Sequence, residues 1–324
     1  MNFFGKSPFR ISFYGGGTDI EPYPSEYEGC CISHSINIGC FASIDLNVDK
    51  KIIENLNFKT KYIFENNKKN DNLFKIFNLS KKNFNYHLKY FFELNTGSGL
   101  GSSGSFISLL SSFINKIEGK SFSKYRIANK AFFYEKKILE TSGGRQDEFA
   151  SVFGGFNFIQ FKKKNITTVK KLKPSFKFKK ELQKKSLLIF TGMNRDGSKI
   201  IDNHIKIYNK NQNIKLLHEI KNLTLEAKNY VKNNDIENFI LKINKYWDLK
   251  KEFNPNVTNN KIDKFIDIAK ENGAYSAKLL GAGNGGHLLI FCEENEKKKI
   301  IKKLEKYGCS ARDFYYQESG LNIS

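Results

Sequence analysis

The stretch Thr96–Phe106, TGSGLGSSGSF, constrains this chain more than any other. Four glycines alternate with serines, and an apolar run at helical spacing continues to Ile114. The pattern predicts a tight glycine loop that leads into the N-terminus of a helix. Glycines let backbone N–H groups approach a ligand closely, and a helix start adds N–H donors without partners. The stretch therefore predicts a phosphate-binding loop, with a flexible Gly/Ser turn as the alternative.

Two common phosphate-binding patterns do not fit this loop. No lysine follows its last glycine, so it is not the G-x-x-x-x-G-K-[ST] loop. No clear βαβ unit with a ribose-binding acid follows, which argues against a dinucleotide fingerprint. Hydroxyls in the loop suit either a phosphate or a metal ion. The candidate nucleotide-binding residues here are Gly97, Ser98, Gly99, Leu100, Gly101, Ser102 and Ser103.

A pair of carboxylates follows at a spacing that suits phosphoryl transfer. Glu135 lies in a helix predicted over Ser121–Leu139, and Asp147 comes twelve residues later, just past the Gly143-Gly144 break. One acid on the helix and one after the turn can face the same site. In phosphoryl transfer one carboxylate holds Mg²⁺ and the other takes or orients a hydroxyl proton. The alternative is two surface acids, which is the usual fate of these residues.

Two further glycine-rich turns follow predicted strands. Ser7–Ile20, SPFRISFYGGGTDI, alternates like a strand and ends in three glycines before Thr18 and Asp19. Leu187–Phe190 is a short apolar strand that leads into Thr191–Ser198, TGMNRDGS, a turn suited to an anion. Such turns permit close backbone approach to a ligand, although ordinary solvated turns look the same.

Composition limits the remaining possibilities. The 324 residues suffice for two domains with their own cores, and no stretch is apolar enough to cross a membrane. The formal net charge of +21 could indicate nucleic acid, but the lysines are spread along the whole chain. We therefore expect small anionic ligands, no nucleic acid and no membrane partner. Without a secretion signal, a cytoplasmic location is expected, and five scattered cysteines predict buried free thiols.

Taken together, these elements resemble the motifs of the GHMP kinase family. The loop resembles its second motif, P-x-G-x-G-L-G-S-S-A, with Asn95 and Gly104 in place of the proline and the alanine. Ser7–Ile20 resembles the first motif in its sugar-kinase form, and Ala277–Phe291 resembles the third, K-x-x-G-A-G-x-G-G. The motifs and the acid pair occur in the family's order over nearly the whole chain.

The resemblance implies an α+β chain with the GHMP kinase fold. It implies a ribosomal-protein-S5-like N-terminal domain over residues 1–180 and a ferredoxin-like C-terminal domain over 181–324, with the active cleft between them. It further implies ATP and Mg²⁺ as cofactors and a small sugar or sugar phosphate as the acceptor. The oligomeric state stays open.

The resemblance also implies roles for particular residues. Asp147 would be the catalytic base with Arg10 beside it, and Glu135 would hold Mg²⁺ together with Ser102 or Ser103. Gly283 of the third motif would lie at the nucleotide end of the cleft. The residues expected to contact the sugar or its phosphate are Gly17, Thr18, Asp19, Arg145, Gln146 and Arg195.

One sequence segment indicates a particular branch of the family. Gly143–Phe149, GGRQDEF, is similar to GGKQDQY of the heptose 7-phosphate kinase branch. That branch implies phosphorylation of the anomeric hydroxyl of D-glycero-D-manno-heptose 7-phosphate to the 1,7-bisphosphate, toward nucleotide-activated heptose for capsule or lipopolysaccharide. A fucokinase- or galactokinase-like enzyme, a non-catalytic sugar-sensing paralogue and an RNA-binding protein remain as alternatives.

Overall fold

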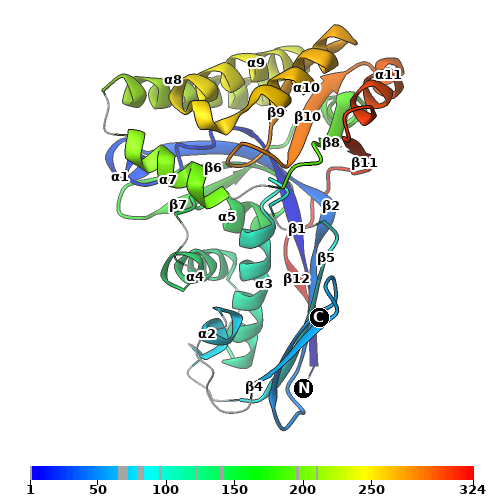
Figure 1. Cartoon of the computed structure of the whole chain (residues 1–324). Coiled ribbons are helices and arrows are strands. Elements are labelled where there is room, and N and C mark those ends of the chain that lie inside the picture. The colour runs from blue at the N-terminus through cyan, green and yellow to red at the C-terminus, as the bar shows by residue number, and fades with distance from the viewer. Residues whose placement is uncertain are drawn as a thin grey trace.

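The first of two sheets forms the long axis of the molecule (Figure 1). The computed structural model describes residues 2–64, 72–78, 80, 84–94, 97–120, 123–138, 140, 142–194, 197–208 and 211–324. Within them the strand order is β12-β1-β2-β5-β3-β4, and β6 pairs with β2 and β7. These strands are β1 (Asn2–Tyr14), β2 (Gly29–Asp45), β3 (Lys51–Asn55), β4 (Thr60–Phe64), β5 (Tyr86–Phe92), β6 (Phe156–Phe161), β7 (Thr167–Lys171) and β12 (Asn322–Ile323).

Strand β1 carries the site because helices cover both of its faces. Near its start, side chains alternate between buried and exposed, whereas every residue of Ser7–Tyr14 is buried. Helices α3 (Ser102–Ile117) and α5 (Gln146–Phe153) contact β1, and so do α8 (Asn211–Lys232) and α9 (Ile236–Phe253). The polar side chains of Arg10 and Ser12 are therefore held in the interior, at the level where the two groups of helices meet.

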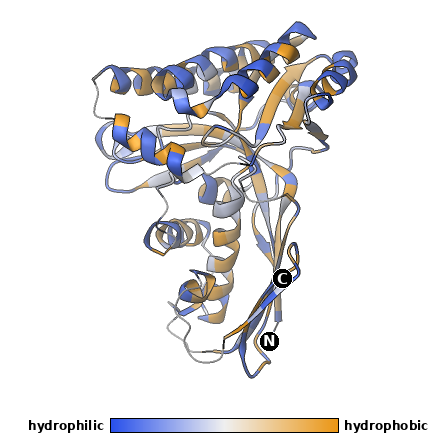
Figure 2. Ribbon diagram, in the orientation of Figure 1, coloured by the Kyte–Doolittle hydropathy of each residue, from blue (hydrophilic) through white to orange (hydrophobic). Residues whose placement is uncertain are grey.

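The helices beside the first sheet follow the predicted amphipathic pattern. Apolar residues of α3 from Phe106 to Ile114 are buried against the sheet, as the orange face of this helix in Figure 2 shows. Helix α4 (Lys124–Lys137) lies within the predicted Ser121–Leu139 and packs on α3 and α5. Within residues 49–85, the described residues form the hairpin β3–β4 and the short helix α2 (Asn72–Asn78).

The second sheet has the order β11-β8-β10-β9, all antiparallel. Its strands and helices alternate as strand, helices, strand, strand, helix, strand, which is the ferredoxin-like arrangement that the sequence implied. The remaining elements are α1 (Tyr23–Tyr27), α6 (Phe176–Lys185), β8 (Ser186–Phe190), α7 (Gly197–Ile207), a 3₁₀ turn (Pro255–Val257), α10 (Asn260–Glu271), β9 (Ala274–Leu279), β10 (His287–Cys292), α11 (Glu294–Glu305) and β11 (Ser310–Arg312).

The two halves of the chain are joined by strand pairing as well as by the segment that connects them. The expected division at residue 180 falls inside α6, and the basic segment 162–185 forms β7 and α6. The end of the described chain returns to the first sheet, where Asn322 and Ile323 pair with Lys6 and Gly5 (Figure 1). The segment 181–324 thus supplies one strand to the N-terminal sheet.

Two smaller expectations concern cysteines and membranes. All five cysteines are buried and free, which confirms the prediction made from their spacing. Among the helices of the described residues, none is both long and apolar enough to cross a membrane.

Candidate active site

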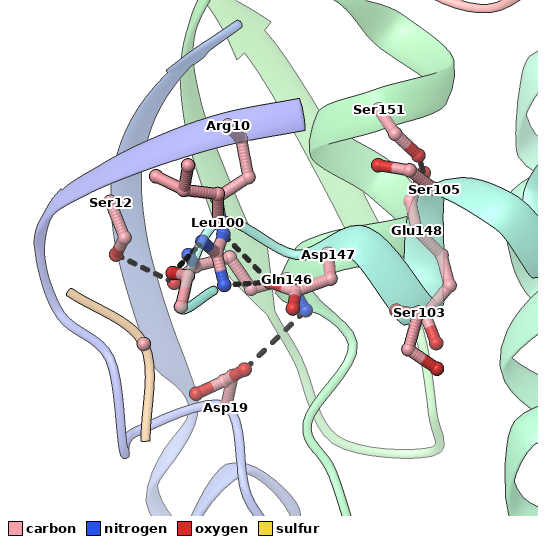
Figure 3. Close-up of polar contacts among 12 residues, drawn as sticks. Arg10, Ser12, Asp19, Leu100, Ser103, Ser105, Gln146, Asp147, Glu148 and Ser151 are labelled. Carbon is pink, nitrogen blue, oxygen red and sulfur yellow. Dashed lines mark hydrogen bonds and ion pairs between the residues drawn. The ribbon is translucent and has the colours of Figure 1, made fainter. Parts of the chain in front are cut away.

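An arginine–aspartate pair lies at the centre of the site. Arg10 donates through Nε (2.8 Å) and Nη2 (2.6 Å) to Oδ1 of Asp147, the second residue of α5 (Figure 3). Nη1 of the same guanidinium donates to the carbonyl of Gly99 at 2.8 Å. Because Arg10 is buried and its side chain is held at both ends, it fixes the position of the aspartate relative to the glycine loop.

The glycine loop presents the first turn of α3 to this pair. Gly101 is the N-cap of α3 with φ 75°, a left-handed conformation that glycine adopts without strain. A Cβ on Gly101 would lie 3.2 Å from Oδ2 of Asp147, and the backbone N–H of Arg10 donates to the Leu100 carbonyl at 3.0 Å. The N–H groups of the helix start are therefore next to the carboxylate, as an anion-binding loop beside a catalytic acid requires.

A hydroxyl and two further carboxylates lie beside the helix start. Ser103 donates from Oγ to Oε1 of Glu135 at 2.7 Å. Glu148 is completely buried, and its carboxyl group lies within hydrogen-bonding reach of the Glu135 side chain. Burial, followed by the charge of Glu135, raises the pKa of Glu148 well above its ordinary value.

These oxygens fit a magnesium ion that is shared with phosphate groups. Mg²⁺ prefers hard oxygen ligands, and beside a nucleotide it needs only one or two protein carboxylates. Ser103 and Glu135 supply a hydroxyl and a carboxylate that already touch, and a nearby cation would relieve the repulsion between Glu135 and buried Glu148. Of the two serines predicted for this role, Ser103 makes the contact with Glu135, while Ser102 lines the cleft.

Another carboxylate, that of Asp19, lines the cleft from the triple-glycine turn. Its Oδ1 accepts from the Gly17 N–H at 3.0 Å, and its Oδ2 accepts from the Gln146 N–H at 3.4 Å (Figure 3). Burial, and to a lesser extent the charge of Asp147, raises the pKa of Asp19. Ser12 donates to Oε1 of Gln146 at 3.1 Å, which orients that amide as well. A carboxylate has about four lone-pair sites, more than the backbone donors around Asp19 occupy, so this side chain can still accept from a ligand hydroxyl.

The opposite wall of the cleft comes from the C-terminal half. Lys278 of β9 donates to the carbonyls of Ser12 and Phe13, both at 2.8 Å, and its ammonium lies 4.3 Å from the ring centre of Tyr246. Burial, with smaller effects from Lys250 and Arg10, lowers the pKa of Lys278 well below its usual range.

Further along this wall, two side chains of α9 contact glycine turns. Tyr246 donates to the Gly16 carbonyl at 3.3 Å, and Lys250 donates to the Gly281 carbonyl at 2.6 Å. Together with His204 of α7, they border a cavity of about 340 Å³ that runs from the glycine loop to α7. The cavity is large enough for a small polar molecule beside the phosphate-binding end.

Most of the residues predicted from the sequence meet in this cavity. It is lined by Arg10, Gly17, Asp19, Gly97, Gly99, Gly101, Ser102, Ser103, Glu135, Gln146 and Asp147.

The structure does not bring all the predicted residues into the cavity. Thr18 donates its hydroxyl to the Gly15 and Cys30 carbonyls, and Leu100 is completely buried. Ser98 lines a smaller cavity on another side of the loop, and a Cβ on Gly283 would meet Val257 at 2.5 Å.

Two predicted cationic contacts require separate mention. The Arg145 guanidinium binds Glu21 at 3.0 Å and Asn165, away from the cavity. Its neighbour Gln146 is the residue of this pair that faces the cleft. Arg195 lies outside the described residues.

Several residues of the cavity were not found from the sequence. These residues are Tyr246, Lys278, His204 and Lys250, and none of them was among the residues predicted for the site. The lysine of the third motif was a signal for Lys278. The others lie on amphipathic helices, where nothing in the spacing distinguishes a residue facing a ligand from one facing the core.

Comparisons with known proteins agree with this geometry. Residues 70–155 match the family described as the GHMP kinases N terminal domain, and residues 227–308 match the family described as GHMP kinases C terminal. The first match contains the glycine loop and the acid pair.

Individual relatives are similar over most of the chain. A D-glycero-alpha-D-manno-heptose 7-phosphate kinase of Campylobacter jejuni is 28% identical over 98% of this chain and 97% of its own length. A bifunctional fucokinase/GDP-fucose pyrophosphorylase of Arabidopsis thaliana is 24% identical over 93% of this chain but only 31% of its own length. The solved structure of a sugar kinase from Campylobacter jejuni superimposes with a TM-score of 0.80, at 26% identity, over 100% of this chain and 98% of that one.

Proposed function

Because the chain belongs to the GHMP kinase family, we propose that it transfers the γ-phosphoryl group of ATP to the anomeric hydroxyl of a sugar, and that this sugar is D-glycero-D-manno-heptose 7-phosphate. The reaction class follows from the family. The choice of sugar draws support from the full-length similarity to a heptose 7-phosphate kinase and from the GGRQDEF spelling.

The observation that carries the proposal is Asp147 held by Arg10 against the start of α3. A sugar hydroxyl that attacks the γ-phosphate must lie between the acid that takes its proton and the donors that hold the phosphate. Both contacts from Arg10 go to Oδ1, so Oδ2, on the side of Gly101, is the oxygen that we assign to the hydroxyl proton. The guanidinium holds the carboxylate in this orientation.

The glycine loop and the N-terminus of α3 would bind the phosphates of ATP through backbone N–H groups and the serine hydroxyls. Ser103 and Glu135 would hold Mg²⁺, which offsets the negative charge of the phosphates. Within this arrangement Arg10 has a second role, because its contact with the Gly99 carbonyl couples the shape of the loop to the position of the aspartate.

On the acceptor side, Asp19 would accept hydrogen bonds from sugar hydroxyls through lone pairs that Gly17 and Gln146 leave open. Lys250, on the same side of the cavity, is a described cation that suits an anionic end of the sugar. A 1,7-bisphosphate product would be suited for later conversion to a nucleotide-activated heptose for surface polysaccharide.

The test is release of ADP from Mg²⁺-ATP with heptose 7-phosphate, mannose, fucose, galactose or no sugar, and with ³¹P NMR of the product to locate the new phosphate. We expect turnover of the heptose phosphate, with an anomeric phosphate as the product. The reaction without sugar sets the background of ATP hydrolysis, and omission of Mg²⁺ should abolish turnover.

Other outcomes would change the proposal in defined ways. Preferred turnover of fucose would retain the kinase and reject the sugar phosphate, in line with the similarity to a fucokinase. Binding of ATP or sugar without turnover of any sugar would reject the enzyme in favour of a sugar sensor.

A further inference from the structure

One polar atom in the cavity wall has no protein partner. Nε2 of His204 is buried, and no group within the described residues forms a hydrogen bond with it. His204 belongs to α7, one turn beyond Ile200 and Ile201, which line the same cavity. A buried ring nitrogen without a partner is costly, so an atom of this kind in a cavity wall indicates a ligand group that completes it.

The surroundings of His204 fix its ring. It packs on the Phe253 ring, with 4.5 Å between ring centres. The opposite edge lies against Gly17, where a Cβ would be 3.1 Å from Cε1 and 3.8 Å from Nδ1. Gly17 has φ 105°, so the position favours glycine both for its backbone and for the space it leaves to the imidazole.

The same Gly17 connects His204 to the acceptor side of the site. The Gly17 N–H donates to Oδ1 of Asp19, so the imidazole and this carboxylate flank one glycine. Both side chains line the cavity, although they come from opposite halves of the chain. The arrangement brings two polar side chains to the same glycine at the cavity wall.

We propose that His204 is a sugar-binding residue whose Nε2 accepts a hydrogen bond from a hydroxyl of the acceptor sugar, next to the hydroxyl taken by Asp19. This inference rests on the proposed function, because it requires that the cavity holds a sugar. It adds a contact from the C-terminal half that no sequence motif indicated.

The chemistry of the ring favours a hydroxyl over a phosphate. Burial, followed by the charge of Lys250, lowers the pKa of His204 to about 3. The ring is therefore neutral near pH 7, and a nitrogen lone pair repels phosphate oxygens but accepts from O–H. The phosphate of the sugar would then lie nearer to Lys250 than to His204.

The experiment compares His204→Phe with His34→Phe. Phenylalanine keeps a ring on Phe253 but removes the nitrogen. His34 is an equally buried histidine that stacks on Phe156 outside the cavity, so it serves as a matched control. For His204→Phe we expect a KM for the sugar about tenfold higher, with kcat and the KM for ATP nearly unchanged. His34→Phe should leave all three values at those of the wild type.

Deoxy sugars make the test independent of folding. The wild type and His204→Phe are assayed with heptose 7-phosphate lacking the hydroxyl at C2, C3 or C4. For the wild type, we expect kcat/KM with one of these analogues to be about tenfold or more below that with the parent sugar. For His204→Phe, kcat/KM should be the same with that analogue as with the parent sugar. His204→Gln, which can present an amide oxygen, should recover part of the sugar affinity.

Two results would overturn the inference. In the first, the wild type turns over all three deoxy analogues as efficiently as the parent sugar. In the second, loss of a hydroxyl lowers turnover by His204→Phe as much as turnover by the wild type. Either result would mean that His204 does not bind a hydroxyl. In both cases turnover of the parent sugar by the wild type would leave the proposed function intact. If the wild type turns over none of the sugars in the panel, the proposed function and this inference both fail.

Discussion

The two walls of the cleft differ in origin. The wall that would face ATP comes from the glycine loop, α3, α4 and α5, all within Gly97–Phe153, with Arg10 added from β1. The wall that would face the sugar combines the turn after β1 with α7, α9 and β9 of the C-terminal half. One wall is nearly continuous in sequence, whereas the other exists only after the two halves have packed together.

This difference corresponds to two chemical tasks. Phosphoryl transfer needs fixed donors and one aspartate at a set position, and short segments with glycines provide these through backbone geometry. Recognition of a particular sugar needs polar atoms on several sides of the ligand. His204 and Asp19, which come from distant segments and both contact Gly17, would meet that need. Changes to the first wall should therefore affect the rate of the chemical step, and changes to the second should affect binding of the sugar.

The largest expected effect tests the first wall. Asp147→Asn removes the proton acceptor but keeps the shape and can still accept a hydrogen bond from Arg10. Because general-base catalysis contributes about 10²–10⁴-fold, we expect kcat to fall about a thousandfold, with the KM for the sugar changed less than threefold. Steady-state kinetics measures both values. A variant that keeps more than a tenth of the wild-type kcat would contradict the assignment of the base.

A smaller effect compares packing in the two walls. A Cβ on Gly104 would lie 2.6 Å from Cβ of Asp147 and 3.1 Å from the Glu148 backbone nitrogen, so Gly104→Ala must separate α3 from α5. We expect a loss of about 1–3 kcal/mol in the free energy of unfolding and at least tenfold lower kcat. Gly197→Ala is the control, because its nearest neighbour would be Cβ of Ala282 at 3.9 Å.

Urea unfolding of both variants measures the difference. The related motif carries alanine at the position of Gly104, which makes the outcome informative about this chain. Unchanged stability and rate in Gly104→Ala would show that α5 can shift without loss, and that the contact between the two helices does not set the position of Asp147.

The smallest expected effect is the dependence of stability on pH. Burial lowers the pKa of His34 to about 4 and that of His204 to about 3, both from 6.5. The stability that each neutral ring provides is complete above pH 6.5 and is lost as the pH falls toward those values. At pH 5 each histidine therefore lowers the free energy of unfolding by about 2 kcal/mol relative to pH 7.5.

Urea unfolding at pH 7.5 and 5.0 checks this value for both histidines. His34→Phe and His204→Phe should each lose about 2 kcal/mol less than the wild type between the two pH values. A smaller difference for His204→Phe than for His34→Phe would mean that water reaches the wall formed by α7, and that this wall is less tightly packed than the core around His34.

The sequence predicted the first wall better than the second for a physical reason. The loop, Glu135 and Asp147 lie in glycine-marked segments whose local conformation places them, so spacing alone indicated one site. Tyr246 and His204 lie on helices that are also part of the core, and their direction depends on how α7 and α9 pack. Arg145, adjacent to two cleft residues, was expected at the substrate but binds Glu21.

In the fold too, the elements with a local sequence pattern were predicted and those without one were missed. Strands β1 and β2 and the ferredoxin-like order of the second sheet were accessible because alternation and motif order indicate them. In the basic segment 162–185, many lysines hide Phe178 and Leu182, the buried residues of α6, so the spacing does not indicate this helix. The return of β12 to β1 was not predicted, since a two-residue strand has no pattern of its own.

That return has a consequence for the order of synthesis on the ribosome. The backbone of β1 is completed by partners made much later, since Phe4 bonds with Ser324 while Lys278 binds the Ser12 and Phe13 carbonyls. The nascent first sheet therefore keeps an open strand until its last partners have left the exit tunnel. Open strands of this kind invite pairing between chains and are targets for chaperones. Fusion of a second protein after Ser324 would place its linker beside β1, where a stiff or apolar linker should lower the yield of folded protein.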